Sequence, residues 1–325
     1  MKRREFLPLF GSAAAGSILW PRLLSAQPAK VPTIGVLTLG NPPPQPFIDG
    51  LRNGLREVGY SDDRNNIKLE LRTAGGVAGR LAELAAELVR LKVDVIVAYQ
   101  TPTAIAAKQA TSEIPIVMAG VGDPVGTGLV ASLARPGGNV TGASAGAVEV
   151  AGKIVELIRE LMPGARRFAV LANETDLFTK PYLAENERSA RSIGLEMVPV
   201  MVRPAGPLEA AFQTMTDKRV DAVVIQGSQV RKDAVELATK HRLPSLGSSL
   251  FVPRSGGLAA YAADFAAYLR NAAVYIDKIL KGEKPADLPV IFPTKFVLAV
   301  NLKTAQAIGL TIPPTLLARA DEVME

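Results

Sequence analysis

Short runs of Val and Ile alternate with amphipathic segments along almost the whole chain, and this alternation constrains the fold more than any other sequence feature. Several runs are continuously apolar, which is typical of strands buried on both faces. The pattern predicts an α/β fold in which helices cover parallel sheets on both sides. The predicted strands are Thr33–Thr38, Ile67–Arg72, Val93–Ala98, Ile114–Ala119, Phe168–Ala172, Leu195–Val200 and Ala222–Gln226.

Apolar residues recur at helical spacing in three segments of the chain. These stripes run from Val77 to Leu91, from Val148 to Leu161 and from Phe265 to Leu280. Because a single apolar face is what a helix needs to pack on a sheet, we interpret all three as core faces rather than as cofactor-binding surfaces.

The strand and helix units fall into two sets, which predict two Rossmann-like lobes. The first set ends near the Gly/Pro-rich stretch at 135–142, and the second runs from Arg166 to about Pro253. Two lobes of about 120 residues each also suit the total length, because single cores stop growing at about 250–300 residues.

The first 26 residues have the layout of an export signal, with a charged start, an apolar middle and a small-residue end. The adjacent Arg3 and Arg4, followed by Phe6-Leu7, resemble the twin-arginine type of signal. The apolar middle is shorter than the about 20 residues that span a bilayer. We therefore expect residues 1–26 to be removed and the mature protein to be periplasmic.

Composition excludes several kinds of site. The chain has no cysteine and one histidine, which rules out disulfide scaffolds, thiolate nucleophiles and metal sites built on Cys or several His. It contains neither a P-loop nor a Gly-rich dinucleotide fingerprint, so we expect no cofactor. The net charge of +6 is partly a property of the first 26 residues, and the basic residues are scattered, so we expect no nucleic-acid partner.

Ligands of open parallel sheets bind beyond the carboxyl ends of the strands, so the residues that follow each strand are the candidate site. Thr101, followed by Pro102, is expected to cap a helix after the third predicted strand. Asp123, followed by Pro124, is expected to cap a helix after the next strand in the same way. The free amides of two adjacent helix starts would attract a carboxylate.

The candidate ligand-binding residues lie at the ends of strands or at helix starts. Thr101, Thr103 and nearby amides are expected to hold a carboxylate, and Asp123 or Asp264 to accept an ammonium. The alternative is that these acids only cap helices. The complete set is Thr38, Tyr99, Gln100, Thr101, Thr103, Asp123, Ser144, Asn173, Asp176, Gly227, Ser228, Tyr261 and Asp264.

The run Gly142-Ala143-Ser144-Ala145-Gly146 matches the nucleophile elbow of serine hydrolases, and His241 follows in the order that a triad requires. The pattern arises easily in a Gly/Ala/Ser-rich turn. A histidine near the end of a predicted helix is explained by the negative charge of that helix end. We expect no enzymatic activity and keep a serine hydrolase built on Ser144 and His241 as an alternative.

Several stretches match a known family. They are GDPV at 122–125 with GLV at 128–130, RPGGNVTG at 135–142, KGEKPADLPV at 281–290, PTKF at 293–296, NLKTA at 301–305 and GLTIPPTLLARADEV at 309–323. In these stretches the sequence resembles the extracytoplasmic substrate-binding proteins of ABC transporters, in the family related to tryptophan and tyrosine uptake components. The resemblance covers nearly the whole mature chain.

The resemblance implies a type I periplasmic binding protein fold, with two α/β lobes joined by three crossovers that close on a ligand. It implies a first lobe of residues 27–144 plus 263–292 and a second lobe of residues 145–262 plus 293–325. The chain departs from the family at Asn173-Glu174-Thr175-Asp176, where relatives often have Asn-Pro pairs. It also departs beside Tyr261, where relatives commonly read Met-Ser-Tyr-Gly.

The function that the resemblance implies is that of a non-catalytic solute receptor. The solute would be a small carboxylate-bearing molecule, an aromatic or branched amino acid or a related organic acid, with Tyr99 and Tyr261 packed on its apolar part. The receptor, expected to be a monomer, would deliver this solute to ABC permease and ATPase subunits. The alternative is a sensor that presents its closed form to a membrane receptor.

Overall fold

The structure is a computed structural model that describes residues 30–40 and 44–325. Contacts group residues 31–325 into one compact unit. The predicted export signal, with its twin arginines and cleavage point, lies outside the described residues. No helix in the described ranges combines the length and apolarity that crossing a membrane requires.

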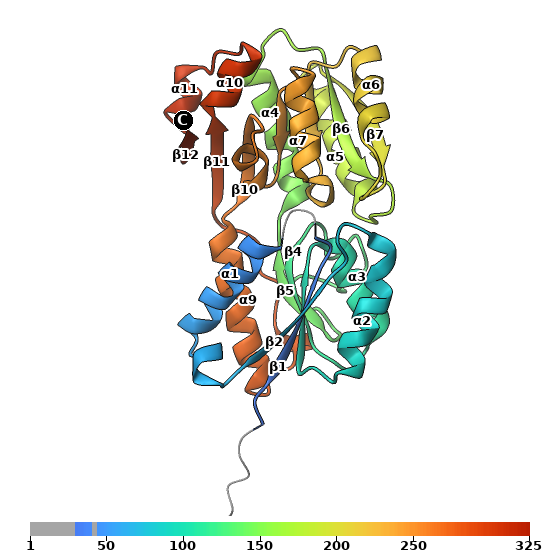
Figure 1. Cartoon of the computed structure of the whole chain (residues 1–325), viewed down its shortest axis with the longest axis vertical. Coiled ribbons are helices and arrows are strands. Elements are labelled where there is room, and N and C mark those ends of the chain that lie inside the picture. Colours follow the sequence, from blue (N-terminus) through green and yellow to red (C-terminus); the bar gives the residue numbers. More distant parts are fainter. Residues whose placement is uncertain (1–29, 41–43) are drawn as a thin grey trace, which may run out of the picture. The chain divides into compact units, whose positions relative to one another are not determined.

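A parallel sheet of five strands organises the first half of this unit (Figure 1). Side chains alternate between the two faces of a strand, so Ile34 and Val36 of the first strand join one apolar core while Leu37 joins another. The strands predicted in this half are confirmed to within two residues. In spatial order the sheet consists of β2 (Lys68–Thr73), β1 (Thr33–Thr38), β3 (Val95–Tyr99), β4 (Ile116–Val121) and β5 (Val140–Ser144).

Helices cover both faces of the five-stranded sheet, as the alternation of strands and helices predicts. One face packs against α2 (Leu81–Arg90) and α3 (Thr101–Ala110), and the other against α1 (Gln45–Glu57) and α9 (Phe265–Leu280). The first predicted stripe is longer than α2, because the first and last residues of the stripe lie outside this helix and are exposed. These are Val77 and Leu91.

Helix α9 returns to the first sheet from a distant part of the sequence and lies beside α1 (Figure 1). A Cβ at Gly54 of α1 would lie 3.1 Å from both the Leu269 carbonyl oxygen and the Ala273 Cβ of α9. A larger residue there would push the two helices apart. Asp264 caps α9 as predicted, because its Oδ1 accepts a hydrogen bond from the Ala267 amide at 3.1 Å.

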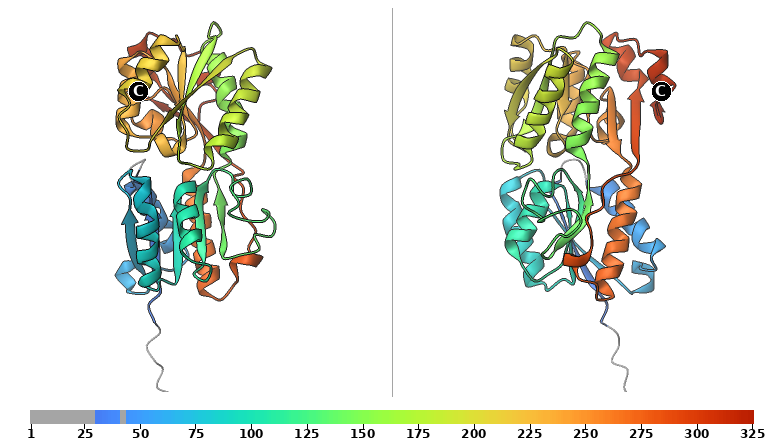
Figure 2. Two further views of the ribbon diagram at one scale, coloured as in Figure 1. Left: turned by 90° about the vertical axis from the view of Figure 1, so that its right-hand side faces the viewer. Right: turned by 180° about the vertical axis from the view of Figure 1, so that it is seen from behind.

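A second sheet of seven strands organises the other half of the unit (Figure 2). All its neighbouring strands are parallel except β10 and β11. The chain leaves β10 into α9 and comes back beside the end of β10, where the Asp264 amide donates to the Lys295 carbonyl at 3.0 Å. Since β11 starts where β10 ends, the two must run in opposite directions.

The three strands predicted in this sheet are confirmed to within two residues. In spatial order the sheet consists of β12 (Glu322–Met324), β11 (Phe296–Asn301), β10 (Ala259–Ala263), β9 (Ser245–Gly247), β8 (Ala222–Ile225), β6 (Arg167–Asn173) and β7 (Glu196–Val202).

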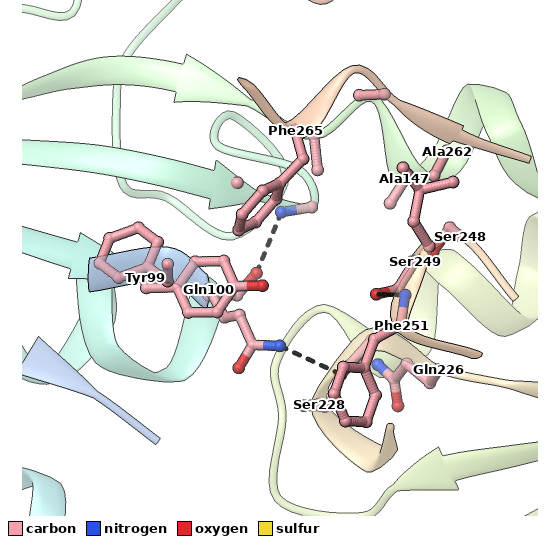
Figure 3. Close-up of a pocket in the computed structure, with 18 of the residues that line it drawn as sticks. Tyr99, Gln100, Ala147, Gln226, Ser228, Ser248, Ser249, Phe251, Ala262 and Phe265 are labelled. Carbon is pink, nitrogen blue, oxygen red and sulfur yellow. Dashed lines mark hydrogen bonds between the residues drawn. The ribbon is translucent and has the colours of Figure 1, made fainter. Parts of the chain in front are cut away.

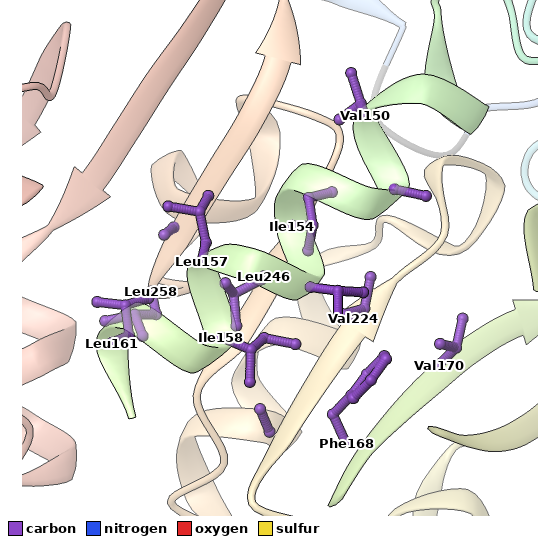
Figure 4. Packing of buried hydrophobic residues seen from close by; sticks show 14 of the residues in the cluster. Val150, Ile154, Leu157, Ile158, Leu161, Phe168, Val170, Val224, Leu246 and Leu258 are labelled. Carbon is purple, nitrogen blue, oxygen red and sulfur yellow. The ribbon is translucent and has the colours of Figure 1, made fainter. Parts of the chain in front are cut away.

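Helix α4 (Ala147–Leu161) shows how the second sheet is covered (Figure 4). Its predicted apolar stripe, from Val148 to Leu161, packs on Phe168 and Val224 of the sheet. Each large apolar side chain that is fully buried in this way stabilises the fold by about 1.5–3 kcal/mol. The same core also contains residues of α5 (Thr179–Ser192), α10 (Leu302–Ile308) and α11 (Pro314–Leu317). A second core of this sheet contains residues of α6 (Glu209–Asp217), α7 (Lys232–Lys240) and α8 (Phe251–Arg254).

Four short 3-10 turns complete the described elements. They are η1 (Asp62–Arg64), η2 (Ala78–Arg80), η3 (Gly227–Gln229) and η4 (Pro285–Asp287). The chain passes between the two sheets three times, after β5, after β10 and before β11. The first and third crossings are joined, because the Ser144 amide donates to the Ile291 carbonyl at 2.9 Å. The predicted lobe limits, 27–144 plus 263–292 and 145–262 plus 293–325, stay a prediction.

Candidate functional site

A cavity of about 320 Å³ opens where strands of both sheets end (Figure 3). This is the position at which parallel α/β sheets bind their ligands, and the volume lies at the lower end of the range of small-molecule sites. The lining residues from the first sheet and its helices are Pro46, Phe47, Tyr99, Gln100, Thr101, Gly120, Gly122, Phe265 and Tyr268. Those from the second sheet and its connections are Ala145, Ala147, Asp176, Phe178, Gln226, Gly227, Ser228, Ser248, Ser249, Leu250, Phe251, Arg254, Ala262 and Ala263.

Four aromatic rings form one wall of this cavity. Phe47 stacks on Tyr99 with ring centroids 4.4 Å apart, and Phe265 meets Tyr99 edge-on at 6.3 Å. Tyr268 continues the wall, 5.0 Å from Phe265. Burial raises the pKa of Tyr99 to about 12 and that of Tyr268 well above its usual value, so both phenols stay neutral. The wall is therefore uncharged and suited to an aromatic or aliphatic group.

Thr101 lies at the cavity, but its hydroxyl does not cap α3. The N-cap position is taken by Gln100, and the Thr101 Oγ1 instead accepts a hydrogen bond from the Gly122 amide at 3.1 Å. Thr103 does not line the cavity, because its Oγ1 turns back to donate to the carbonyls of Tyr99 and Gln100 at 2.7 and 2.8 Å. Of the two hydroxyls predicted to hold a carboxylate, that of Thr103 thus already donates to backbone carbonyls, whereas that of Thr101 accepts from a backbone amide.

The helix predicted after Asp123 does not form. The Asp123 Oδ1 accepts from the Gly126 amide at 2.8 Å, and the chain turns through Pro124 to Gly128 without a helix. Two glycines, at 126 and 128, make a helix unfavourable here. Of the two helix starts predicted from Thr101 and Asp123, only that of α3 is therefore present at the cavity, and Asp123 does not line the cavity.

The opposite wall holds an acid in a polar network. Asp176 is 7% exposed, and its carboxylate accepts from the Ser228 hydroxyl and from the Phe178 amide, both at 3.0 Å. Asn173 extends the network behind the wall through its Nδ2, 3.4 Å from Ser228. Burial raises the pKa of the Asp176 carboxyl, and these hydrogen bonds offset part of that effect. No Lys or Arg among the described residues forms a salt bridge with it.

The other predicted residues are not part of the cavity lining. Tyr261 stacks on Phe296 at 5.6 Å, and Asp264, besides capping α9, pairs with Lys295 at 3.2 Å. Thr38 is fully buried in β1. Six of the predicted residues line the cavity, namely Tyr99, Gln100, Thr101, Asp176, Gly227 and Ser228. Seven do not, namely Thr38, Thr103, Asp123, Ser144, Asn173, Tyr261 and Asp264.

The hydrolase alternative fails on geometry. Ser144 is the last residue of β5, is 2% exposed, and donates its hydroxyl proton to the Val121 carbonyl at 3.2 Å. His241 follows α7, where its Nδ1 lies 3.2 Å from the Thr216 hydroxyl. Each side chain is hydrogen-bonded to a different part of the fold, so Ser144 and His241 do not pair. The described residues also contain no cluster of three His, Asp or Glu that would hold a metal.

Sequence reasoning missed most of the aromatic wall. Phe265 belongs to a stripe that we interpreted as core, and Tyr268 lies in the first turn of the same helix. Because this helix starts at the carboxyl end of β10, both reach the cavity. Position at a helix start was the available signal. Arg254 was also missed, and it lies at the cavity with its Nη2 3.0 Å from both carboxylate oxygens of Glu322.

Comparison with known proteins shows the family of this chain. The family described as ABC transporter substrate binding protein matches residues 37–324. A tyrosine-binding protein of Clostridioides difficile (strain R20291) is 28% identical over 273 residues, which make up 82% of this chain and 78% of that protein.

Two solved structures cover 90% of this chain and 99% of their own. The ABC domain from Streptococcus pneumonia in complex with L-Trp is 31% identical with a TM-score of 0.83. The ligand-free, open structure of CD0873 from Clostridium difficile is 25% identical with a TM-score of 0.63. The described unit therefore resembles the ligand-bound structure more than the open one. Sugar- and leucine-binding proteins at 14–16% identity share the two-lobed type I fold alone.

Proposed function

The chain belongs to the ABC transporter substrate binding protein family, and on that premise we propose that it is an extracytoplasmic receptor for an aromatic amino acid. The receptor binds the amino acid between its lobes as a monomer and delivers it to permease and ATPase subunits in the membrane. Members of this family bind a substrate and do not transform it. The observation that carries the proposal is the pairing of an aromatic wall with one buried acid, Asp176, that forms no salt bridge with a described Lys or Arg.

The aromatic wall supports a planar apolar group as the main source of affinity. Phe47, Tyr99 and Phe265 present ring faces and edges that match the offset and edge-on contacts preferred between aromatic rings. Each such contact adds about 0.5–1.5 kcal/mol beyond the area that it buries. A tyrosine or tryptophan side chain would use this wall more fully than a short aliphatic one.

Asp176 supports an amine on the same ligand. A carboxylate that is buried without a cation is costly, and a ligand ammonium would remove that cost. Hydrogen bonds to charged groups contribute about 1.5–3 kcal/mol, which is enough to favour amino acids over acids that lack the amine. Asp176 therefore replaces Asp123 and Asp264, neither of which lines the cavity, as the expected partner of the ammonium.

The ligand carboxylate would meet neutral donors. Arg254 is the only cationic side chain among the described residues that line the cavity, and it already pairs with Glu322. The donors that remain include the hydroxyls of Thr101 and Ser249 and the amides at the start of α4 near Ala147. Amides at a helix start attract anions.

The relatives support the same class of ligand. One is a tyrosine-binding protein, and the other was solved in complex with L-Trp. Tyrosine and tryptophan both fit a cavity whose wall is aromatic.

Calorimetry and thermal unfolding of residues 27–325 test this function. We expect L-Trp or L-Tyr to bind with micromolar affinity, about −8 kcal/mol, and to add about 2.7 kcal/mol of stability at 100 times Kd. Indole-3-propionate, which lacks the amine of L-Trp, should bind at least about tenfold more weakly. Stabilisation by sugars alone, or equal affinity for the analogue, would contradict the proposal.

A further inference from the structure

Gln100 has a backbone conformation that side chains with a Cβ rarely adopt. Its φ is 76° and its ψ is 165°, a region populated essentially by glycine. The other described non-glycine residues with positive φ differ, because their φ of 50–55° is typical of ordinary left-handed turns. They are Asn65, Lys92, Arg219 and Arg242.

The turn between β3 and α3 imposes this conformation. The Gln100 amide donates to the Ala119 carbonyl at 3.1 Å, which continues the sheet. The Gln100 carbonyl accepts from the Ala104 amide at 3.3 Å and from the Thr103 hydroxyl at 2.8 Å, which begins the helix. Because both backbone groups are committed, the strain belongs to the turn itself and a glycine would fit it better.

The Gln100 side chain forms a hydrogen bond that a glycine at this position could not form. Its Nε2 donates to the Gly227 carbonyl of η3 at 3.0 Å, so it joins the first-sheet side of the cavity to the second-sheet side (Figure 3). The residue is 9% exposed and lines the cavity. Strain of this kind persists at ligand clamps because the strained residue has a function.

We propose that Gln100 is a positioning residue that latches the second sheet over the bound solute, an inference that rests on the proposed function. The bond spans the cavity and exists only while the two sides are close together. It therefore acts after the solute has entered, and it slows solute release rather than capture. Affinity set in this way appears in the dissociation rate.

The latch is also built to be weak. The Oε1 of Gln100 is buried and has no hydrogen-bond partner among the described residues. The amide gains one hydrogen bond and leaves one acceptor unpaired, and these two effects oppose each other. A latch with a small net free energy opens readily, as a receptor that must hand over its solute requires.

Three substitutions separate the amide from the strain. Gln100→Met keeps the length and the strain but removes the donor, Gln100→Ala keeps the strain alone, and Gln100→Gly removes both. Stopped-flow binding of L-Trp to residues 27–325 should show dissociation about 3- to 10-fold faster in all three variants. Association should change by less than about twofold, because the bond forms after capture.

The unliganded variants report the strain. Gln100→Gly should unfold about 2–4 °C higher than Gln100→Ala, since glycine accepts the conformation without cost. The matched control is Arg219→Gly, which changes an exposed positive-φ residue far from the cavity lining. It should leave the dissociation rate of L-Trp unchanged.

If L-Trp dissociates from Gln100→Met and Gln100→Ala as slowly as from the wild type, the latch is wrong. If Gln100→Gly and Gln100→Ala unfold at the same temperature, position 100 is not strained and the argument for the latch fails. If wild-type protein binds neither L-Trp nor L-Tyr, the proposed function fails separately. The latch is then judged with the solute that a thermal-shift panel of amino acids, aromatic acids and sugars identifies. Dissociation of that solute should be faster from Gln100→Met than from the wild type, and equal rates overturn the proposal.

Discussion

The two walls of the cavity differ in chemistry. The first-sheet wall is built from the rings of Phe47, Tyr99 and Phe265, whereas polar groups on the second-sheet wall form a hydrogen-bonded network around Asp176 and Ser228. Apolar area supplies affinity without direction, and hydrogen bonds to a buried charge supply direction and selectivity. Neither wall alone explains a receptor that closes, because closure is driven only when the ligand gains contacts on both sides.

Removal of the charge on the polar wall should have the largest effect. Asp176→Asn keeps the shape of the side chain and loses the ionised partner of the ammonium, so we expect about 10- to 100-fold weaker binding of L-Trp in calorimetry. Asp123→Asn is the matched control, because it keeps a turn-capping oxygen and lies off the cavity. A loss of affinity as large in the control would show that the second-sheet acid has no special role.

A steric contact between the walls gives the next largest effect. A Cβ at Gly122 would lie 2.7 Å from ring atoms of Phe178 on the opposite wall. Overpacking of this kind costs about 1–3 kcal/mol unless the two sides separate. Gly122→Ala should therefore weaken L-Trp binding by about 5- to 50-fold.

The double variant tests the cause of that loss. Phe178→Leu removes the ring edge, so Gly122→Ala combined with Phe178→Leu should bind better than Gly122→Ala alone in the same calorimetric titration. Additive losses would mean that Gly122 acts locally in its own turn and not across the cavity.

Weakening the aromatic wall should have a smaller effect. Tyr99→Leu keeps a large apolar group and removes the ring stacked on Phe47, so we expect about 3- to 10-fold weaker binding of L-Trp. Tyr261→Leu is the control, because Tyr261 stacks on Phe296 outside the cavity. Both variants should lose stability on heating, but only the first should lose affinity.

The smallest effect is a dependence on pH that belongs to the polar wall alone. Burial raises the pKa of the Asp176 carboxyl above 3.8, and an ammonium binds its ionised form. Binding of L-Trp should therefore weaken as pH falls through that raised pKa and should release protons there. Stability of the unliganded protein should change in the opposite sense, rising as pH falls from the raised pKa towards 3.8.

Calorimetry in two buffers of different ionisation enthalpy measures the proton release. Asp176→Asn should abolish both the release and the pH dependence. An unchanged pH profile in that variant would assign the titration to another group.

The predictions made from sequence succeeded where the signal was local. The strands from Thr33 to Thr38 and from Phe168 to Ala172 were found because continuous apolar runs report burial on both faces. The position of β11 between β10 and β12 and its direction were not found, because they depend on where the chain re-enters the second sheet. The helix predicted at Asp123 failed because a capping residue followed by Pro also fits a simple turn.

The sequence by itself determined the α/β class, the two sets of strands and the family, since periodicity and motif composition are local properties. Only the tertiary structure decided which loop residues meet. It brought Asp176 rather than Asp123 or Asp264 to the cavity, and it placed Gln100 opposite Gly227. The physical reason is that a binding site consists of groups distant in sequence, whose separation in space is set by packing of the whole sheet.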